Sequence, residues 1–160
     1  MEQIWAPWRA VYIGGDHSDR CIFCEKLESE QDERNLVLLR GELTFVMMNL
    51  YPYNNGHLLI APKRHVGKIE EINEDEMTEL FKMTQKMIKV LRVFKPEGFN
   101  VGANLGRVAG AGVPGHFHIH IVPRWNGDTN FMPVLGETKV ISESLEETYK
   151  KIKESLAKLE

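Results

Sequence analysis

The sequence contains little cysteine, no long basic run and no long apolar run, and each shortage excludes a class of protein. Its 160 residues include two cysteines and carry a formal net charge of −3 at pH 7. No segment approaches the roughly 20 consecutive apolar residues of a membrane span, and the N-terminus lacks the basic and then apolar layout of a secretion signal. A chain without a basic stretch is not built to wrap nucleic acid or an anionic membrane. We therefore expect a cytoplasmic protein without a nucleic-acid or membrane partner.

The length and the hydrophobic content favour one compact domain. Hydrophobic residues make up 42% of the chain, which is enough to bury a core of ordinary size. No internal repeat is visible in the sequence. We expect a single domain over residues 1–160.

The chain is rich instead in histidine within one short segment. His116, His118 and His120 alternate with Phe117 and Ile119. Alternation with period two puts the three imidazoles on one face of a β-strand and the apolar side chains on the other. Because histidine carries protons, metals or a covalent phosphoryl group near neutral pH, this concentration indicates a reactive site rather than packing.

The spacing of the three histidines along a strand indicates that they have different roles. At about 3.3 Å per residue, the backbones of His116 and His120 lie roughly 13 Å apart, too far for easy convergence on one ion bound at about 2.0–2.1 Å. One imidazole can instead act as a nucleophile while its neighbours hold phosphate or metal. A neutral imidazole that donates its Nδ1–H to a carbonyl keeps a lone pair on Nε2, which can attack phosphorus. His118, flanked by the other two, is the predicted nucleophile.

The two cysteines, Cys21 and Cys24, are separated by two residues. This spacing suits the binding of a metal or a redox cycle better than the cross-linking of a secreted fold. Both interpretations remain open from the spacing alone.

A glycine-rich loop precedes the histidines. Residues 106–115 contain four glycines, so their backbone can approach a ligand closely and turn N–H groups toward an anion. The alternative is a surface connection without a ligand, and the neighbouring histidines favour the phosphate site. The segment is not a Walker loop, because no Gly-Lys-Ser/Thr follows.

The hydrophobic pattern predicts five strands and two helices. Strands are expected at 36–40, 43–49, 57–61, 99–105 and 116–123, and the first two, separated by Gly41-Glu42, are expected to form a hairpin with a tight turn. Asn73 and Glu76 have the spacing of a capping box, which opens a long helix that ends before Pro96 and Gly98. Its predicted core stripe comprises Met77, Leu80, Phe81, Thr84, Met87, Ile88, Leu91 and Phe94. A last amphipathic helix from about Ser142 carries Leu145, Tyr149, Ile152, Leu156 and Leu159. The order favours an α+β domain with an antiparallel sheet packed under helices.

The histidine segment resembles the defining motif of the histidine triad (HIT) superfamily of nucleotide hydrolases and transferases. Residues 45–62 are similar to the nucleoside-binding strand pair of the superfamily, so the resemblance covers nearly the whole chain. The opening Trp5 to Arg9 and residues 123–131 resemble most the bacterial diadenosine tetraphosphate phosphorylase branch. The resemblance implies a HIT-like fold and a homodimer. It divides the chain into a zinc-binding segment (1–35), a HIT core (36–131) and a C-terminal extension with a helix (132–160).

The resemblance also implies roles for individual residues. His118 would form a nucleotidyl-imidazole intermediate in a ping-pong reaction, and His120 would contact the α-phosphate. The remaining expected site residues are His116, Asn49 at the ribose hydroxyls, His57 near the active site, Asn104 at phosphate oxygens, and Gly110 and Gly112 in the nucleotide-binding loop.

A structural zinc site is implied in the same way. Relatives with an N-terminal Cys-x-x-Cys bind zinc at positions that correspond to Cys21, Cys24, His65 and His116. Two thiolates and two imidazoles form a closed tetrahedral set, which is typical of structural zinc. His17 has no assigned role.

Two departures from the superfamily pattern bear on the activity. Gly112-Val113-Pro114 stands where many members carry Gln-Ser/Thr-Val, which leaves the acceptor of the second step open. The uridylyltransferases have glutamine in place of His120, which argues against hexose-1-phosphate transfer. We expect cleavage of dinucleoside polyphosphates such as diadenosine tetraphosphate, by phosphorolysis or hydrolysis. The alternatives are a nucleoside phosphoramidase of the histidine triad nucleotide-binding type, and a nucleotide-binding interaction module with little turnover.

Overall fold

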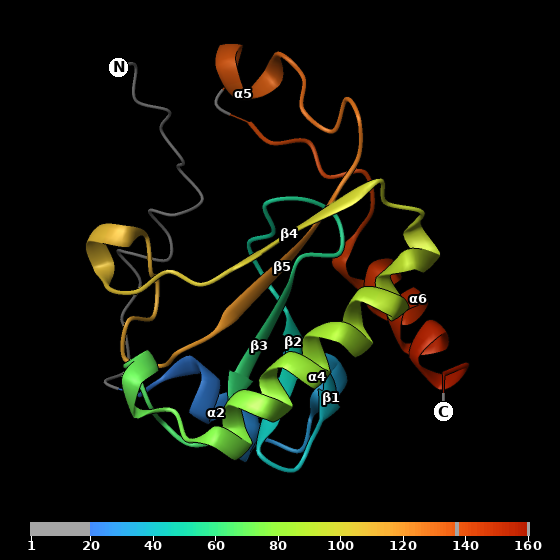
Figure 1. The fold of residues 1–160 in the computed structure, drawn as a ribbon. Helices are drawn as coiled ribbons and strands as arrows, with labels where there is room; N and C mark the ends of the chain where they lie inside the picture. Colours follow the sequence, from blue (N-terminus) through green and yellow to red (C-terminus); the bar gives the residue numbers. More distant parts are fainter. Residues whose placement is uncertain (1–19, 137, 160) are drawn as a thin grey trace.

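A computed structural model describes residues 20–136 and 138–159, which form one sheet of five antiparallel strands with helices on it (Figure 1). The predicted α+β class and five-stranded antiparallel sheet are confirmed. The order across the sheet is β1-β2-β3-β5-β4. The resemblance noted at Trp5 to Arg9, the start of the expected segment 1–35 and His17 lie outside the described residues. The strands are β1 (Val37–Arg40), β2 (Thr44–Met48), β3 (Leu58–Pro62), β4 (Gly98–Gly102) and β5 (Ile119–Arg124).

The turn between β1 and β2 is fixed by a helix on the sheet. The Gly41 N–H donates to the Thr44 carbonyl at 2.8 Å. The Glu79 carboxylate accepts from the N–H groups of Leu43 and Thr44 and, at 2.8 Å, from the Thr44 hydroxyl. A Cβ at Gly41 would collide with this carboxylate. The predicted hairpin therefore forms, and the Glu79 carboxylate lies close to Gly41, where a side chain would make it shift.

The long helix α4 (Glu74–Leu91) covers one face of the sheet (Figure 1). It begins with the predicted capping box, in which Asn73 accepts from the Glu76 N–H at 2.9 Å and Glu76 accepts from the Asn73 N–H. A short 3₁₀ helix, Arg92–Phe94, follows it, and Lys95 in the left-handed region ends the run. The predicted placement of this helix is thus confirmed.

One member of the predicted core stripe is wrong. Phe81 is 59% exposed, whereas Leu80 and Met87 are fully buried. The buried face is turned away from Phe81 toward Glu76 and Val90, which are also buried. The C-terminal helix α6 (Leu145–Ala157) packs against α4 at Val90, whose carbonyl accepts from the Ser155 hydroxyl at 2.9 Å, and Arg64 pairs with Glu76.

Helix α6 closes the main core. Its Tyr149 hydroxyl donates to the Val37 carbonyl at 2.9 Å, and Ile152 and Leu156 are buried in the core. It begins after Ser144, whose hydroxyl accepts from the Glu147 N–H, three residues later than the predicted start at about Ser142. Leu159, which was expected on this helix, lies two residues beyond its end at Ala157 and is 50% exposed.

The opposite face of the sheet carries a smaller apolar cluster. Helices α2 (Ile22–Glu28) and α3 (Asp32–Asn35) precede β1, and Phe23 of α2 packs against Phe45 and Ala61 of the sheet. Arg40 ties this region together through paired hydrogen bonds to Asp32. Helix α2 covers only part of this sheet face. The end of the face that carries the histidines is left for a site.

The two predicted strands on either side of the glycine loop are shorter than expected at their loop ends. β4 ends at Gly102, not at residue 105, and β5 begins at Ile119, not at His116. The late start of β5 follows from Pro62 at the end of β3. Because Lys63 donates its N–H to β2, the backbone of Pro62 faces β5, where proline has no N–H to continue the ladder. The Phe117 N–H bonds the Val66 carbonyl at 2.7 Å instead.

The remaining elements are short. They are α5 (Met132–Leu135) and the 3₁₀ helices Ile69–Glu71 and Arg107–Ala109, the last of which lies in the glycine-rich loop. Among residues 20–136 and 138–159, no helix is both long and apolar enough to cross a bilayer.

Candidate functional site

The three histidines keep their alternation although two of them precede β5. Phe117, Ile119 and Ile121 belong to the main core under α4. The imidazoles lie on the other face, where the ring centroids of His118 and His120 are 4.9 Å apart. The predicted division into one apolar and one histidine face is therefore present.

His116 belongs to a group of four metal-binding side chains. Ligand atoms of Cys21, Cys24, His65 and His116 all lie within 4.8 Å of one another. The His116 Nδ1 is 3.3 Å from the Cys21 Sγ and 3.7 Å from the Cys24 Sγ, and the His65 Nδ1 is 3.4 Å from the Cys24 Sγ. The residues expected as zinc ligands thus lie together.

The geometry of this cluster fits a tetrahedral ion. Bond lengths of about 2.3 Å to sulfur and 2.1 Å to nitrogen put neighbouring ligand atoms about 3.6 Å apart at the tetrahedral angle, close to the separations found here. The His116 Nε2–H donates to the Pro62 carbonyl at 2.8 Å, so Nδ1 carries the lone pair that faces the sulfurs. These four residues could hold a metal.

The cysteines are not joined in a disulfide. Without a metal, burial and the neighbouring Cys21 raise the pKa of the Cys24 thiol to about 11. Because the thiolate is both the redox-active form and the form that binds metal, this pKa bears on both interpretations alike. The imidazole nitrogens of His65 and His116 beside the sulfurs favour the metal site.

The tautomer of His118 is set by the backbone. Its Nδ1 lies 2.8 Å from the His116 carbonyl oxygen, which can only accept, so Nδ1 carries the proton. Nε2 therefore keeps the lone pair that a nucleophile needs. Burial lowers the pKa of His118, so the ring is neutral near pH 7. The His118 ring is thus neutral, with its proton on Nδ1 and its lone pair on Nε2.

The tautomer of His120 is set by a chain of hydrogen bonds. The Tyr53 N–H donates to the His57 Nδ1 at 3.0 Å, so the proton of the neutral His57 ring is on Nε2. This Nε2–H donates to the His120 Nδ1 at 2.9 Å, which leaves the His120 proton on its own Nε2. Among the described residues, that buried Nε2 has no hydrogen-bond partner. His118 thus offers a lone pair and His120 offers an N–H.

Burial keeps the hydrogen-bonded imidazoles of His57 and His120 uncharged. Burial first, and the neighbouring histidines second, lower the pKa of His57 to about 3 and that of His120 to about 4. Asn49 adds a long contact of 3.4 Å from its Nδ2 to the His57 Nδ1. The expected ribose residue therefore lies beside the His57 and His120 pair.

The glycine-rich loop is partly closed on itself. The N–H groups of Ala109 and Ala111 both donate to the Gly106 carbonyl, and that of Gly110 donates to Arg107. The Asn104 Nδ2 donates to the Gly110 carbonyl at 3.3 Å. The side chain of Asn104 therefore contacts the loop, and the N–H of Gly110 is bonded to a carbonyl of the same loop. Exposed Gly112 lies beyond this closed part of the loop.

Two aromatic residues of the site were missed by the sequence analysis. The buried Phe23 ring lies 4.9 Å from both the His116 and the His118 rings, between the metal-binding group and the nucleophile. Tyr53 stacks on His120 with ring centroids 5.8 Å apart and planes 11° apart. The position of Phe23 inside the Cys-x-x-Cys was the available signal, whereas nothing in the sequence distinguished Tyr53.

Comparison with known proteins identifies what the chain is similar to. The family model described as "HIT domain" matches residues 30–127. The chain is 40% identical over 158 residues to a protein of Mycobacterium tuberculosis named AP-4-A phosphorylase, over 92% of this chain and 80% of that protein.

Solved structures give the same fold. A hypothetical histidine triad nucleotide-binding protein from Sulfolobus tokodaii is 30% identical, with a TM-score of 0.70 over 87% of this chain and 93% of that one. A histidine triad family protein from Mycobacterium smegmatis, described as Zn-bound, has a TM-score of 0.71 over 87% of this chain and 94% of that one. At 23% identity, this second likeness supports the fold alone.

Proposed function

The chain belongs to the HIT domain family, and on that premise we propose that it is a nucleotidyl-transfer enzyme that cleaves dinucleoside polyphosphates such as diadenosine tetraphosphate. The observation that carries the proposal is the pair of tautomers at the histidine face. His118 has an Nε2 lone pair, because its Nδ1 proton is held by the His116 carbonyl. The name of the M. tuberculosis relative, AP-4-A phosphorylase, supports the choice of substrate.

The first step transfers a nucleotidyl group to His118. Its Nε2 attacks the α-phosphorus, the N–P bond forms, and the anhydride P–O bond breaks with its electron pair on the departing phosphate oxygen. The Nδ1–H remains bonded to the His116 carbonyl and stabilises the positive charge of the substituted ring. The buried His120 Nε2–H is the donor for the charge that develops on the phosphoryl oxygens.

The second step releases the nucleotide. An oxygen of inorganic phosphate or water attacks the same phosphorus, the P–N bond breaks, and its electron pair returns to the His118 Nε2. With Gly112-Val113-Pro114 in place of the usual polar side chains, we assign the acceptor contact to loop N–H groups from Gly112 onward. Asn49 contacts the ribose, and Asn104 and Gly110 border the phosphates as part of the loop.

We propose that zinc occupies the cluster of Cys21, Cys24, His65 and His116. Its four donors and their spacing suit a closed structural site. Zinc would supply no reaction step but a rigid link between the N-terminal segment and the histidine strand. His116 would then hold its carbonyl in place for the Nδ1–H of His118.

The proposed assembly rests on the resemblance, and the proposed location on the composition of the sequence. We propose a single-domain homodimer in the cytoplasm, with residues 1–35 as the zinc-binding segment, 36–131 as the HIT core and 132–160 as the C-terminal extension. Sedimentation at micromolar concentration tests the dimer. A monomer over the working range would contradict it.

The test of the activity is an incubation with diadenosine tetraphosphate, with and without inorganic phosphate. ADP plus ATP formed only with phosphate indicates a phosphorylase, and AMP plus ATP formed in water indicates a hydrolase. Replacing the nucleophile, His118→Ala, should lower kcat by roughly 10³-fold or more. Trapping of a ³²P-labelled enzyme that is absent in this variant would support the covalent step. No turnover, or activity that survives the substitution, contradicts the proposal.

A further inference from the structure

A hollow next to the histidine site lies on the same face of the sheet as the histidines. It has a volume of about 350 Å³, and its walls include Val122 and Arg124 of β5 and Asn100 of β4. Because side chains alternate along a strand, His118, His120, Val122 and Arg124 share one face. The hollow therefore continues the histidine face beyond His120, on the side of β4.

Tyr53 connects the hollow to the catalytic histidines. Its side chain lines the hollow, while its ring stacks on His120 and lies 4.5 Å from the His57 ring. The ring is 44% exposed. A ligand that reaches from the His120 Nε2 into the hollow would pass along this ring.

Two cations line the hollow, and both are held in place. Arg124 donates to the Asp128 carboxylate through Nε and NH2 and to the Asn100 Oδ1 through NH1. Lys139 donates to the Asp128 carbonyl at 2.7 Å. A guanidinium has five N–H donors and an ammonium has three, so each cation retains donors after these bonds.

The single carboxylate in this network does not cancel the positive charge. Arg124 and Lys139 supply two positive charges and Asp128 one negative charge, a net of +1. The Asp128 carboxylate also accepts from Asn54 and from the Trp125 N–H, so its oxygens are occupied. The remaining donors of Arg124 and Lys139, with the Thr129 side chain in the wall, are suited to phosphate oxygens.

Distance decides which phosphates these are. Arg124 lies four residues beyond His120, roughly 13 Å along the strand, whereas an attacking group must approach to within about 3–3.5 Å of the reacting atom. The acceptor of the second step therefore cannot react from this hollow. A departing nucleotide, by contrast, extends away from the reacting phosphorus by its whole phosphate chain.

Direction supports the same assignment. Asn49, proposed at the ribose of the transferred nucleotide, follows β2, while Asn100 in the wall of the hollow belongs to β4. The order β2-β3-β5-β4 puts the histidines between the two. Asn49 and Asn100 thus lie on opposite sides of His118 and His120, and the hollow extends from Tyr53, in the same loop as Asn49, across to Asn100.

We propose that this hollow, walled by Tyr53, Asn100, Arg124 and Lys139, binds the distal phosphates and nucleoside of the leaving nucleotide. The proposal rests on the proposed function, because it names the half of the dinucleoside polyphosphate that departs. Arg124 and Lys139 select substrates whose leaving group is itself a polyphosphate.

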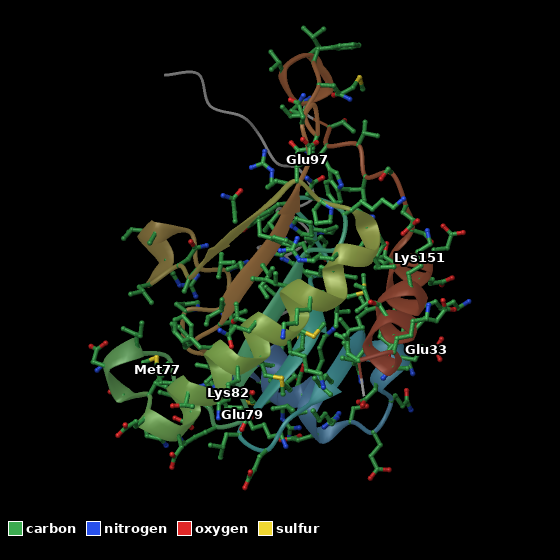
Figure 2. The ribbon with its side chains drawn as sticks, turned by 45° about the vertical axis from the view of Figure 1, so that its right-hand side comes forward. Glu33, Met77, Glu79, Lys82, Glu97 and Lys151 are labelled. Atoms are coloured by element: carbon green, nitrogen blue, oxygen red, sulfur yellow. The ribbon has the colours of Figure 1, made fainter. Side chains whose placement is uncertain are left out.

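The test replaces Lys139 by a neutral side chain of similar length, Lys139→Met. The matched control is Lys82→Met, because Lys82 is exposed on α4 over the other face of the sheet (Figure 2). Calorimetry measures the Kd of AMP and of ATP for each protein. Loss of one charge-assisted contact should raise the Kd of ATP roughly 5- to 20-fold in Lys139→Met. The Kd of AMP, and both values in the control, should stay within about twofold of the wild type.

Kinetics on diadenosine tetraphosphate gives an independent readout. In Lys139→Met, KM should rise by a similar factor while kcat changes little, because the contact lies away from the reacting atoms. Arg124→Lys, which keeps the charge but loses the planar fork, should give a smaller rise in KM.

The two proposals fail in different ways. An unchanged Kd of ATP in Lys139→Met, or an equal rise for AMP and ATP, overturns the assignment of the hollow whatever the turnover. Lack of turnover of diadenosine tetraphosphate by the wild type overturns the proposed function instead. Tripolyphosphate serves as a third ligand: if it binds as tightly as ATP, the hollow recognises phosphate alone and the nucleoside part of the assignment is wrong.

Discussion

The two ends of the histidine segment differ in what holds them. At the first end, His116 turns its Nδ1 lone pair toward two cysteine sulfurs, because its Nε2–H is bonded to Pro62. At the other end, His120 turns an N–H outward, because its Nδ1 accepts from His57. The same residue type thus presents a lone pair at one end and a proton at the other. The assignment of roles comes from the neighbours of each ring rather than from the rings themselves.

Removal of the metal end should have the largest effect. Cys24→Ser deletes one of the four donors, so we expect loss of stoichiometric zinc and a decrease in Tm of roughly 5–10 °C, since structural zinc contributes directly to folding. Metal analysis and calorimetry of the purified variant measure both. The control is wild-type protein treated with a chelator, which should show the same lowered Tm as the Cys24→Ser variant. Zinc retained by the variant would contradict the site.

Removal of the hydrogen-bonded end should affect catalysis and leave the metal alone. His57→Leu deletes the donor that fixes the His120 tautomer, and we expect kcat to fall roughly 10- to 100-fold. His57→Gln, which can still donate to the His120 Nδ1, should recover part of this loss. Both variants should contain as much zinc as the wild type. Equal kcat in His57→Leu and the wild type would show that His120 needs no such support.

Acid should reveal the buried neutral histidines of the hydrogen-bonded end through stability. The pKa values of His57 and His120 in the folded protein, about 3 and about 4, lie below the ordinary value of 6.5. The unfolded chain therefore binds more protons below pH 6.5, and the free energy of unfolding falls as the pH is lowered toward 4. Urea unfolding at pH 7 and pH 5 measures this, and His57→Gln should lose about 1–2 kcal/mol less than the wild type. The same loss in both proteins would mean that His57 is not buried in its neutral form.

The smallest expected effect comes from a residue that belongs to neither end. Asn73→Ala removes the side-chain cap of α4 and should reduce the free energy of unfolding by about 1 kcal/mol, with zinc content and kcat/KM unchanged. Urea titration gives the first quantity and the product assay the last. A lowered kcat/KM would show that α4 transmits strain across the sheet to the histidines.

The sequence predicted most of the fold because its signals are local. The capping box of Asn73 and Glu76, the alternation through His120 and the hairpin between β1 and β2 each depend on residues close in the chain. Errors occurred where distant elements decide the outcome. Phe81 fits the helical spacing of the predicted stripe but is 59% exposed, because the width of the buried stripe depends on which elements cover α4, and α6 is far from α4 in the sequence.

The candidate site was predicted in the same uneven way. The cluster of Cys21, Cys24, His65 and His116 was expected from resemblance, and the structure brings its donor atoms together. The Tyr53 N–H could not be identified, since a backbone group has no signature in the sequence. The glycine content of residues 106–115 suggested free N–H groups, but three of them donate to carbonyls of the same loop.

Pro62 ends the pairing of β3 with β5 before His118, and this affects how the histidines are arranged. With an N–H at that position, pairing with β5 could continue past Ile119, and Phe117 would no longer need the carbonyl of Val66. Longer pairing would straighten the segment that now lets the first histidine reach the cysteines and the second reach its carbonyl. Because Pro62 has no N–H, the backbone of His116 and His118 is not held in the sheet. The two imidazoles can therefore face different partners, the cysteines for His116 and a backbone carbonyl for His118.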